Sequence, residues 1–591
     1  MASYISNMLK RPKNREAIAV VTRYPSPGSC KTKLIPAIGG RGAARAQLLM
    51  TEHLLSEVQT VKLSKPDLQV FVYYCGATID DMRYWFDRKY PGLSPIFKQQ
   101  TGLNLGEIIA NIFKQTFAAG NERTIVVGSD IPGVNYNILE DALSLLKWDE
   151  NDVTIGKALD GGYYLIGLNR RTSALIEPLF MKGIEWGTER VYTQQIEAAE
   201  FLSLKVATLE QQLSDVDVAD DLRVLEDCLS VTTDELVNPQ WSIIIPVFNE
   251  EDVIAETLDT LFQNIDGSNS IEVIVADGGS TDSTIDKVKQ VMSNHPEAKF
   301  SLMETKACRG HQQKIGADGA TGDILLFLHA DTLLPPNYNT LASDCLWTPG
   351  NVAGAFQFSV SKTESSTKFQ DFQIKMLEWG TNCRSKYVEL PYGDQALFIR
   401  RCYYDKIGGI PDHRLFEDFV MVEAAKRIGH IGIVAAPCQT SARRYQRNGF
   451  WRNTCLNSAM IAAYKFGYHP NDIANWYYGK PPTDTDHREL GEDKSSSADD
   501  DSRGEEEREE TTGSQVTVDA STPDSRVGEA DVSRGGQIDV SRGGEADVSR
   551  VGETDVVQGG EADVSRGGET DVVQGGETDV SRVGEADVTS N

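Results

Sequence analysis

The chain has 591 residues, too many for a single hydrophobic core, so several structural units are expected. Its net charge of −29 is concentrated at one end: residues 481–591 carry 30 acidic and 10 basic side chains, which leaves a net charge of −9 on the first 480 residues. A mildly acidic body argues against non-specific nucleic-acid binding. The nine cysteines form no C-x-x-C pair, which favours a reducing compartment over a disulfide framework.

Residues 1–14 are predicted to form a polar, basic N-terminal extension. They contain no apolar core of a secretory signal, and no apolar run in the chain approaches the roughly 20 residues that span a bilayer. We therefore expect a soluble cytoplasmic protein without a transmembrane segment. The apolar stretch at 457–468 is expected to pack in a core, although peripheral contact with a membrane stays open.

A first α/β block is predicted over residues 15–232. Its opening stretch, "AIAVVTRYPSPGSCKTKL" (17–34), combines a strand with a basic loop, and a helical pattern follows. The loop is not a P-loop, because Cys30 stands where glycine must precede Lys31 and two prolines remove amide donors. Further strands are predicted at "LQVFVYYC", "TIVVGSD" and "DVTIG".

A second α/β block is predicted over residues 241–480, after a polar linker at 233–240. Its first strands are expected at "WSIIIPVFNE", "IEVIVADGG" and "DILLFLHADT". The alternation of strands and helices in both blocks favours parallel sheets. The predicted class is therefore α/β, with two such domains in tandem.

The C-terminal segment 481–591 is acidic and of low complexity. Residues 526–589 are eight copies of an octapeptide such as "RGGEADVS", which offers only valine and a few other small or aliphatic residues for burial. This composition does not offset the entropy of ordering, so a disordered tail is favoured over a β-solenoid.

Polar side chains follow three predicted strands of the second block. Asn249 and Glu250 come after the first strand, Asp277 ends the second and Asp331 follows the third. Because the carboxyl ends of parallel strands meet in one crevice, these side chains are expected to converge on a ligand. Carboxylates there can bind a nucleoside or hold Mg²⁺ or Mn²⁺ against a diphosphate. Asp418, ahead of a helix in "LFEDF", is the candidate general base for a hydroxyl acceptor.

Four arginines in "SARRYQRNGFWR" follow that helix: Arg443, Arg444, Arg447 and Arg452. Such cations can neutralise a departing diphosphate, although a solvated helix face is the ordinary alternative. The acids have ordinary interpretations as well, as strand-end turn residues or, for Glu417, as a helix cap.

Two acids of the first block occupy similar positions. Asp130 ends the strand "TIVVGSD", and Asp160 precedes a Gly-Gly turn. Carboxylates at adjacent strand ends can hold a divalent metal against the phosphates of a nucleotide. The cations Arg23, Lys31 and Lys33 would face those phosphates from the first loop, unless the lysines are only solvated surface residues.

The second block, about residues 240–470, resembles family 2 glycosyltransferases of the GT-A nucleotide-diphospho-sugar transferase fold, in particular the subgroup called selenodomain-associated transferase 2. The matching stretches, in order, are "IIPVFNEE", "VADGGSTDST", "GATGDILLFLHADTLLP", "PYGDQALFIRR", "LFEDF" and "SARRY". The resemblance implies an inverting, metal-dependent hexosyl transfer from a nucleoside-diphosphate sugar to a hydroxyl acceptor. It implies that Asp331 binds Mg²⁺ or Mn²⁺ and that Asp418 deprotonates the acceptor. The residues predicted to bind the donor are Pro246, Asn249, Glu250, Asp277, Arg309 and Arg444.

Two positions depart from the wider family. His329 takes the first place of the D-x-D element, where many relatives carry an acid, and this is a trait of the subgroup. Lys314 stands where asparagine is more usual. The identity of the sugar and of the base therefore stays open.

The first block, about residues 15–230, resembles selenodomain-associated transferase 1, which is similar to 2-phospholactate guanylyltransferase and to GT-A-like nucleotidyltransferases. The matching stretches are "TRYPSPGSCKTKL", "GSDIP", "ALDGGYYLIGL" and "WGT". The resemblance implies nucleotidyl or glycosyl transfer, with Asp130 and Asp160 as metal ligands. The chain lacks the glycine-rich loop of true nucleotidyltransferases.

Three functional accounts stay open. The favoured one is a glycosyltransferase domain fused to a nucleotide-binding transferase-like domain. The alternatives are two independent glycosyltransferases, or an inactive nucleotide-sensing scaffold that displays the acidic tail. For a transferase, the expected partners are a nucleoside-diphosphate sugar and an unknown hydroxyl acceptor, and no nucleic acid.

Overall fold

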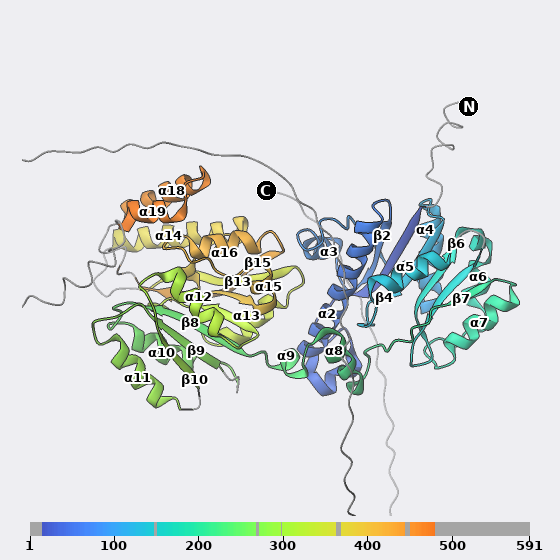
Figure 1. The fold of residues 1–591 in the computed structure, drawn as a ribbon, viewed down its shortest axis with the longest axis horizontal. Helices are drawn as coiled ribbons and strands as arrows, with labels where there is room; N and C mark the ends of the chain where they lie inside the picture. Colours follow the sequence, from blue (N-terminus) through green and yellow to red (C-terminus); the bar gives the residue numbers. More distant parts are fainter. Residues whose placement is uncertain are drawn as a thin grey trace, which may run out of the picture. The chain divides into compact units, whose positions relative to one another are not determined.

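The structure is a computed structural model that describes residues 15–146, 150–267, 271–296, 298–361, 368–441, 443 and 450–478. The predicted N-terminal extension at 1–14 and the predicted repeat tail at 481–591 lie outside these residues. The described residues form two α/β domains, each built around one sheet (Figure 1).

The first domain contains a seven-stranded sheet in the order β3-β2-β1-β4-β6-β5-β7. Its strands are β1 (Glu16–Arg23), β2 (Gln69–Cys75), β3 (Ile96–Gln99), β4 (Arg123–Gly128), β5 (Val153–Lys157), β6 (Tyr163–Asn169) and β7 (Val206–Thr208). Its helices are α2 (Ile35–Ser64), α3 (Ile79–Phe86), α4 (Leu105–Ala118), α5 (Tyr136–Leu145), α6 (Ile176–Met181), α7 (Val191–Phe201), α8 (Leu222–Leu229) and α9 (Thr233–Val237), with 3-10 turns η1 (Thr32–Leu34), η2 (Arg170–Leu175) and η3 (Ala219–Asp221).

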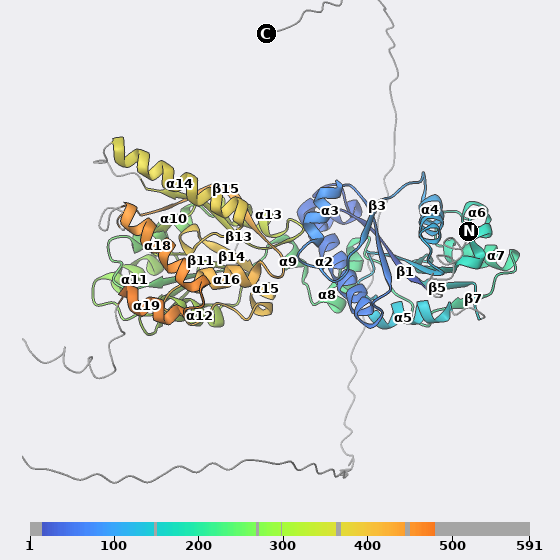
Figure 2. The same cartoon turned by 90° about the horizontal axis from the view of Figure 1, so that it is seen from above.

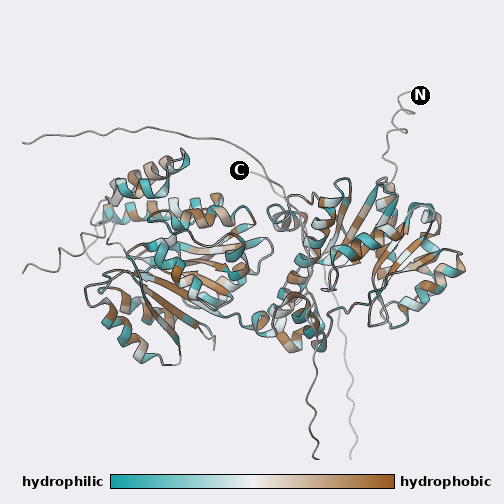
Figure 3. Ribbon diagram, viewed as in Figure 1, coloured by the Kyte–Doolittle hydropathy of each residue, from teal (hydrophilic) through white to brown (hydrophobic). Residues whose placement is uncertain are grey.

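Strand β1 is central in the first sheet and is buried on both faces. Ile18 and Val20 pack in the core with α2 and α5, whereas Ala17 and Ala19 pack in the opposite core with α4 and α6 (Figures 1 and 2). A strand covered on both sides needs apolar residues at consecutive positions, which explains the run "AIAVV". Figure 3 shows the same pattern as brown central strands in both domains.

Both sheets are mixed, which corrects the expectation of parallel sheets. In the first, β6 runs antiparallel to β4 and β5. Only residues 158–162 separate β5 from β6, too few for the helix that a parallel crossover needs. Gly161 makes this turn with φ of +89°, and a Cβ atom there would lie 2.1 Å from the carbonyl oxygen of Glu189. The tight turn places Asp160 at the end of β5.

The second domain contains an eight-stranded sheet in the order β10-β9-β8-β11-β14-β13-β15-β12, in which β14 is antiparallel to β11 and β13. Its strands are β8 (Trp241–Val247), β9 (Ile271–Asp277), β10 (Lys299–Glu304), β11 (Ile324–Phe327), β12 (Thr332–Leu333), β13 (Asn351–Val360), β14 (Leu397–Arg400) and β15 (His430–Thr440). Its helices are α10 (Ile254–Gln263), α11 (Thr284–Asn294), α12 (Arg309–Gly319), α13 (Tyr338–Leu346), α14 (Lys368–Val388), α15 (Arg401–Lys406), α16 (Glu417–Ala425), α18 (Phe450–Lys465) and α19 (Pro470–Tyr478), with the 3-10 turn η4 (Gly393–Gln395).

The two sheets share the arrangement of their first four strands. In each, the third, second, first and fourth strands lie side by side in that order and run parallel. This confirms the predicted α/β class with two GT-A-like domains in tandem. Because these strands are parallel, their carboxyl ends lie at one edge of each sheet, where loops can build a site.

The predicted linker at 233–240 contains the short helix α9. Thr232 caps this helix by accepting a hydrogen bond from the Glu235 amide at 3.2 Å. Leu236 is buried and packs with Ile38 and Ala43 of α2. The segment is therefore ordered by packing on the first domain, and the domain boundary at 240 stays a prediction.

Phe398 of β14 provides a test of the second core. Its side chain is fully buried and meets Phe356 edge-to-face, with 5.4 Å between ring centroids. Phe398→Ala should lower the free energy of unfolding of the second domain by about 3–5 kcal/mol, because it removes buried apolar surface and leaves a cavity. Urea denaturation measures this loss. Phe201→Ala, at a side chain that is 88% exposed, is the control and should change it by less than about 0.5 kcal/mol. Similar values for the two variants would contradict the described packing.

Candidate functional site

The second domain has a cavity of about 310 Å³ beside the carboxyl ends of β8 and β11. Asn249 and Asp277 are not among its lining residues, and Arg444 lies outside the described residues. The lining residues that the sequence predicts are Pro246, Glu250, Arg309, Asp331 and Asp418, and the cavity is completed by others that include His329, Tyr392 and Asp394.

Asp277 ends β9 and organises the loop that follows it. Its carboxylate accepts hydrogen bonds from the Ser280 hydroxyl at 2.6 Å and from the Gly279 amide at 3.0 Å. Asn249 adopts φ of +53° and its side-chain oxygen accepts a hydrogen bond from the Thr281 amide at 2.8 Å. The two predicted donor-binding residues thus order the loops after β8 and β9, and hydrogen bonds from Gly279 and Ser280 already occupy both oxygens of the Asp277 carboxylate.

Arg443 links two acids of the cavity. Its guanidinium lies 2.7 Å from Glu250 Oε2 and 3.9 Å from Asp331 Oδ2. Burial raises the pKa of Glu250, and the hydrogen bond from Arg443 opposes that shift. Arg443 does not line the cavity and its side chain is 44% exposed, but it contacts two acids that do line the cavity.

A strained residue directs the acids that begin α16. Phe416 adopts φ of +66°, a conformation that costs a bulky side chain of order 1–3 kcal/mol. The next side chain, Glu417, is fully buried and pairs with Arg309 through a short hydrogen bond. Burial raises the pKa of Glu417, and Arg309 opposes the shift. Glu417 therefore positions Arg309, a role beyond capping a helix.

Asp418 points into the cavity and is held by backbone amides. Its Oδ2 accepts a hydrogen bond from Gly393 at 2.6 Å, and its Oδ1 accepts one from Phe419 at 2.7 Å. A Cβ atom on Gly393 would lie 2.7 Å from His329 Nε2 and 3.1 Å from Asp418 Oδ2, so only glycine lets η4 approach both side chains. The same turn presents Asp394, which sequence reasoning missed although "PYGDQ" was a matching stretch.

The donor atoms of this cavity suit a hard divalent cation. Asp331, Asp394 and Glu250 contribute carboxylate oxygens, the ligands that Mg²⁺ and Mn²⁺ prefer. Asp331 is 30% exposed and reachable from the cavity. The chemistry of these side chains suits the cation that the resemblance implies, but within the described ranges no three such side chains are arranged to hold a metal ion, so Asp331 as its ligand stays a prediction.

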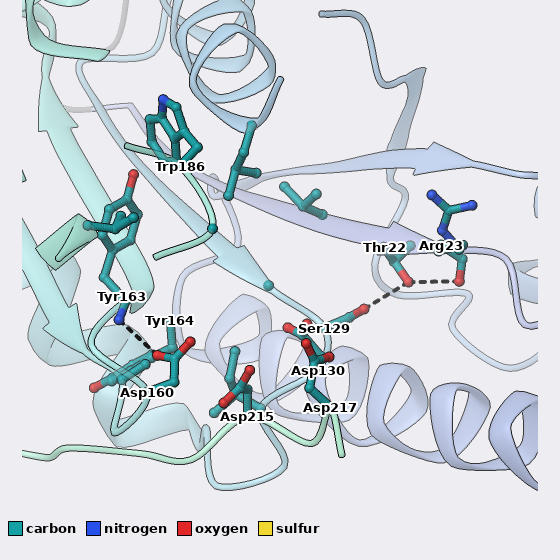
Figure 4. A pocket seen from close by; sticks show the side chains of 18 of the residues that line it. Thr22, Arg23, Ser129, Asp130, Asp160, Tyr163, Tyr164, Trp186, Asp215 and Asp217 are labelled. Atoms are coloured by element: carbon teal, nitrogen blue, oxygen red, sulfur yellow. Dashed lines mark hydrogen bonds between the residues drawn. The ribbon is translucent and has the colours of Figure 1, made fainter. Parts of the chain in front are cut away.

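The first domain has a larger cavity of about 640 Å³ beside the ends of β1, β4 and β6. All five predicted residues of this domain line it: Arg23, Lys31, Lys33, Asp130 and Asp160. Figure 4 shows Asp160, Asp215, Asp217 and Asp130 along one side of the cavity, with Tyr163 and Trp186 at one end. The ring centroids of these two aromatic residues lie 6.4 Å apart in an edge-to-face pair.

Lys31 is the central cation of this cavity. Its Nζ lies 2.7 Å from Asp217 Oδ1 and 3.1 Å from Asp130 Oδ2, and the side chain is only 7% exposed. Burial disfavours the charge, but the two carboxylates outweigh it and raise the pKa of the ammonium. Its backbone adopts φ of +43°. The alternative of a solvated loop is therefore wrong for Lys31, whereas Lys33, 66% exposed and 3.2 Å from Asp217, lies at the rim.

Asp215 and Asp217 are site residues that sequence reasoning missed. They flank the buried Val216 in the connection that leads to η3. Burial raises the pKa of Asp215 to about 6, and repulsion from Asp160, Asp217 and Asp130 adds to the shift. The available signal was the pair of acids around a valine in "DVD", since Val216 is buried while Val218 is exposed.

Four carboxylates around one cavity supply oxygen donors that fit a divalent cation. Lys31 occupies the position between two of them. Among the residues that the structure describes, no group of three or more histidine, cysteine, aspartate or glutamate side chains is arranged to hold a metal ion. Asp130 and Asp160 as metal ligands therefore stay a prediction.

Comparison with known families matches the two domains separately. Residues 59–188 match the family described as "Uncharacterized protein conserved in bacteria (DUF2064)", and residues 242–388 match "Glycosyl transferase family 2". The chain thus contains one segment that matches DUF2064, followed by one that matches family 2 glycosyltransferases. This confirms the fusion that the sequence motifs predicted.

Individual relatives cover parts of the chain. The probable glycosyltransferase YdaM of Bacillus subtilis (strain 168) is 25% identical over 200 residues, 32% of this chain and 48% of its own length, so the chain spans about half of that relative. Among solved structures, a protein of Desulfovibrio desulfuricans G20 described as a nucleotide-diphospho-sugar transferase is 29% identical and covers 38% of this chain and 91% of its own, with a TM-score of 0.32. The mannosyltransferase PcManGT of Pyrobaculum calidifontis, solved with GDP-Man and Mn²⁺, is 21% identical and covers 41% of this chain and 79% of its own, with a TM-score of 0.29.

Membrane-spanning segments were predicted to be absent. Across the described ranges of the chain, none of the helices combines the length and the apolar character that crossing a bilayer requires.

The raised pKa of Asp215 generates a pH-dependent prediction. Its folded pKa of about 6 lies above the ordinary value, so the stability that its protonation provides is present at low pH and is lost as the pH rises through about 6. Asp215→Asn should therefore raise the thermal midpoint of the first domain above about pH 7 and change it little near about pH 4.

Differential scanning calorimetry at both pH values measures this difference. Asp67→Asn removes one carboxylate from an exposed turn and is the matched control. A destabilised Asp215→Asn variant at neutral pH would contradict the described cluster.

Proposed function

We propose that the second domain is a metal-dependent, inverting glycosyltransferase that moves a sugar from a nucleoside-diphosphate donor to a hydroxyl acceptor. The observation that carries the proposal is the convergence of Glu250, Arg309, Asp331 and Asp418 on one cavity. The first three lie within residues 242–388, which match family 2 glycosyltransferases, and Asp418 lies beyond that match. The fold match supports sugar transfer as the reaction class, and the cavity supports the assignment of roles.

Asp418 is the proposed general base. It lines the cavity, and two backbone amides fix its carboxylate while each oxygen keeps a lone pair for an acceptor hydroxyl. The acceptor oxygen attacks the anomeric carbon, its proton passes to Asp418, and the bond to the diphosphate breaks with the electron pair leaving on the diphosphate. One displacement from the opposite side inverts the anomeric centre.

The leaving diphosphate requires positive charge nearby. Asp331 would hold Mg²⁺ or Mn²⁺, which supplies charge neutralisation at the diphosphate oxygens when bound. Arg309 lines the cavity and is positioned by Glu417, and Arg443 lies against Glu250 and Asp331, two acids that line it. Prepositioned cations need no reorganisation during the reaction, which is the condition for effective electrostatic stabilisation.

The nucleoside is assigned to the loops at the ends of β8 and β9. Asp277 and Asn249 hold these loops together, and Pro246 lines the adjoining cavity. A base or ribose that donates a hydrogen bond to Asp277 would replace one of the bonds from Gly279 and Ser280.

The first domain is proposed to bind a nucleotide. Its cavity combines Arg23, Lys31 and Lys33 with four carboxylates and an aromatic pair, which suits phosphates, a cation and a base respectively. A second candidate function, two independent glycosyltransferases, is favoured by the shared strand order of the two sheets. The scaffold alternative requires that neither domain turns over a donor.

Two isosteric variants test the second domain. Asp418→Asn should reduce turnover about a hundredfold or more while nucleotide binding persists, because only the proton acceptor is lost. Asp331→Asn should abolish the Mn²⁺-dependent part of donor binding. Release of the nucleoside diphosphate from UDP-glucose and GDP-mannose, with hydrolysis by water as the basal reaction, measures turnover, and calorimetry measures binding. Asp318→Asn, on the exposed side of α12, is the matched control. Full activity of Asp418→Asn would contradict the assignment of Asp418 as the general base.

A separate variant tests the first domain. Lys31→Met keeps the length of the side chain but removes its charge, so Asp130 and Asp217 lose their shared ammonium. We expect loss of nucleoside triphosphate binding by the first domain, with donor binding by the second domain unchanged. Thermal shift with GTP and CTP in the presence of Mg²⁺ reads this out. Lys182→Met, at an exposed position, is the control. Equal nucleotide binding by wild type and Lys31→Met would contradict the proposed site.

A further inference from the structure

Helix α14 (Lys368–Val388) has two apolar faces, and only one of them is used for packing. On the inner face, Ile374 and Leu377 pack against Phe358 and Val360 of β13. Glu378 fixes this face, because its Oε1 accepts hydrogen bonds from the Ser359 hydroxyl at 3.0 Å and the Val360 amide at 2.9 Å. The helix therefore lies flat along the domain.

The outer face of α14 carries a row of large apolar side chains. Their spacings of three, four, three and eight residues return each to one side of a helix with 3.6 residues per turn, opposite Ile374 and Leu377. The row is Phe369 (66% exposed), Phe372 (58%), Met376 (45%), Trp379 (71%) and Tyr387 (76%). Single exposed apolar residues are common, but a continuous row of this kind indicates an interaction surface.

Lysines border this row along one side. Lys368, Lys375 and Lys386 are exposed, and their spacing places all three on the same flank of the helix. Of the two acids of α14, Glu378 turns inward to β13, whereas Asp371 is exposed beside Lys368 and Lys375, so three lysines and one acid give this flank a net positive charge. Aromatic side chains and methionine beside lysines are the composition of helices that lie in the headgroup region of a membrane.

We propose that the outer face of α14 docks this protein on a membrane surface that contains anionic lipids. The aromatic row would enter the boundary between headgroups and acyl chains, and the three lysines would contact the negative headgroups. Because α14 lies along β13, all side chains of the row could enter the membrane surface to a similar depth. The proposal is independent of the sugar-transfer proposal, since it is measured without donor or acceptor.

Two other occupants fit the surface less well. A second copy that met the same patch with antiparallel helices would bring the two lysine rows together. The acidic repeats at 526–589 would suit the lysines, but they contain no aromatic residue and no leucine or methionine to cover the row. An anionic lipid surface can contact both the apolar row and the three lysines.

The docking face is connected to the cavity of the second domain. Arg384 of α14 stacks over Tyr392 at 3.5 Å from the ring centroid, and Tyr392 lines that cavity. Docking through α14 would therefore hold the cavity at a fixed place relative to the lipid surface.

Sedimentation of the full chain with vesicles tests the proposal. We expect strong co-sedimentation with phosphatidylcholine vesicles that contain about 30% phosphatidylglycerol and weak co-sedimentation with phosphatidylcholine alone. Phe372→Ser/Trp379→Ser should lower the partition coefficient roughly tenfold or more, because two aromatic side chains no longer enter the bilayer boundary. Lys368→Glu/Lys375→Glu/Lys386→Glu should remove the preference for phosphatidylglycerol.

Leu63→Ser/Phe201→Ser is the matched control, since these side chains are 76% and 88% exposed on the first domain. All substituted side chains are exposed, so circular dichroism spectra should be unchanged. The proposal is overturned if wild type binds neither vesicle, or if the control double variant loses as much binding. It is also overturned if Phe372→Ser/Trp379→Ser changes only the mass measured by light scattering, which would identify a second copy as the occupant.

Discussion

Repulsion between carboxylates gathered beside the strand ends is the constraint that organises both cavities. In each domain the strands and the loops that follow them bring acids to one edge of the sheet, where they are costly unless a cation lies between them. Lys31 contacts Asp130 and Asp217 in the first domain, and Arg443 contacts Glu250 and Asp331 in the second. A ligand that enters either cavity must keep these contacts or replace them with its own charges and a metal ion.

The same loops contain strained backbone. Lys31 and Phe416 both have positive φ. Lys31 lines the first cavity, and Phe416 lines the second and directly precedes Glu417. Such conformations cost of order 1–3 kcal/mol and persist where the surroundings determine them. In the second domain the buried pair of Glu417 and Arg309 provides that support. The protein thus accepts local instability to hold charged groups at fixed positions.

The strands and the acids that directly follow them were predictable from the sequence. An aspartate at the end of an apolar run lies at the edge of a parallel sheet where the carboxyl ends of the strands meet. Strand direction was not predictable from the run itself: β6 resembles any buried strand, and the short turn at Gly161 decides its orientation. Asp215 and Asp217 were missed because they lie in irregular chain. Their place depends on pairing far along the sequence, where β7 joins β5 and Leu213 bridges Ala158.

Helix α14 shows a different limit. Its sequence contains apolar residues on two faces, and periodicity does not say which face is buried. Packing on β13 settles this and leaves the aromatic row outward. The role of Arg384 was likewise invisible in sequence, because its partner Tyr392 lies beyond the end of the helix.

The most direct test of the central claim is a crystal structure of the full chain with Mn²⁺ and UDP or GDP, in which anomalous scattering locates the metal. The account predicts a Mn²⁺ peak bonded to a carboxylate oxygen of Asp331, with the diphosphate beside it in the second-domain cavity. A Mn²⁺–nucleotide complex bound only elsewhere, or an empty second-domain cavity at saturating concentrations of both, would contradict it.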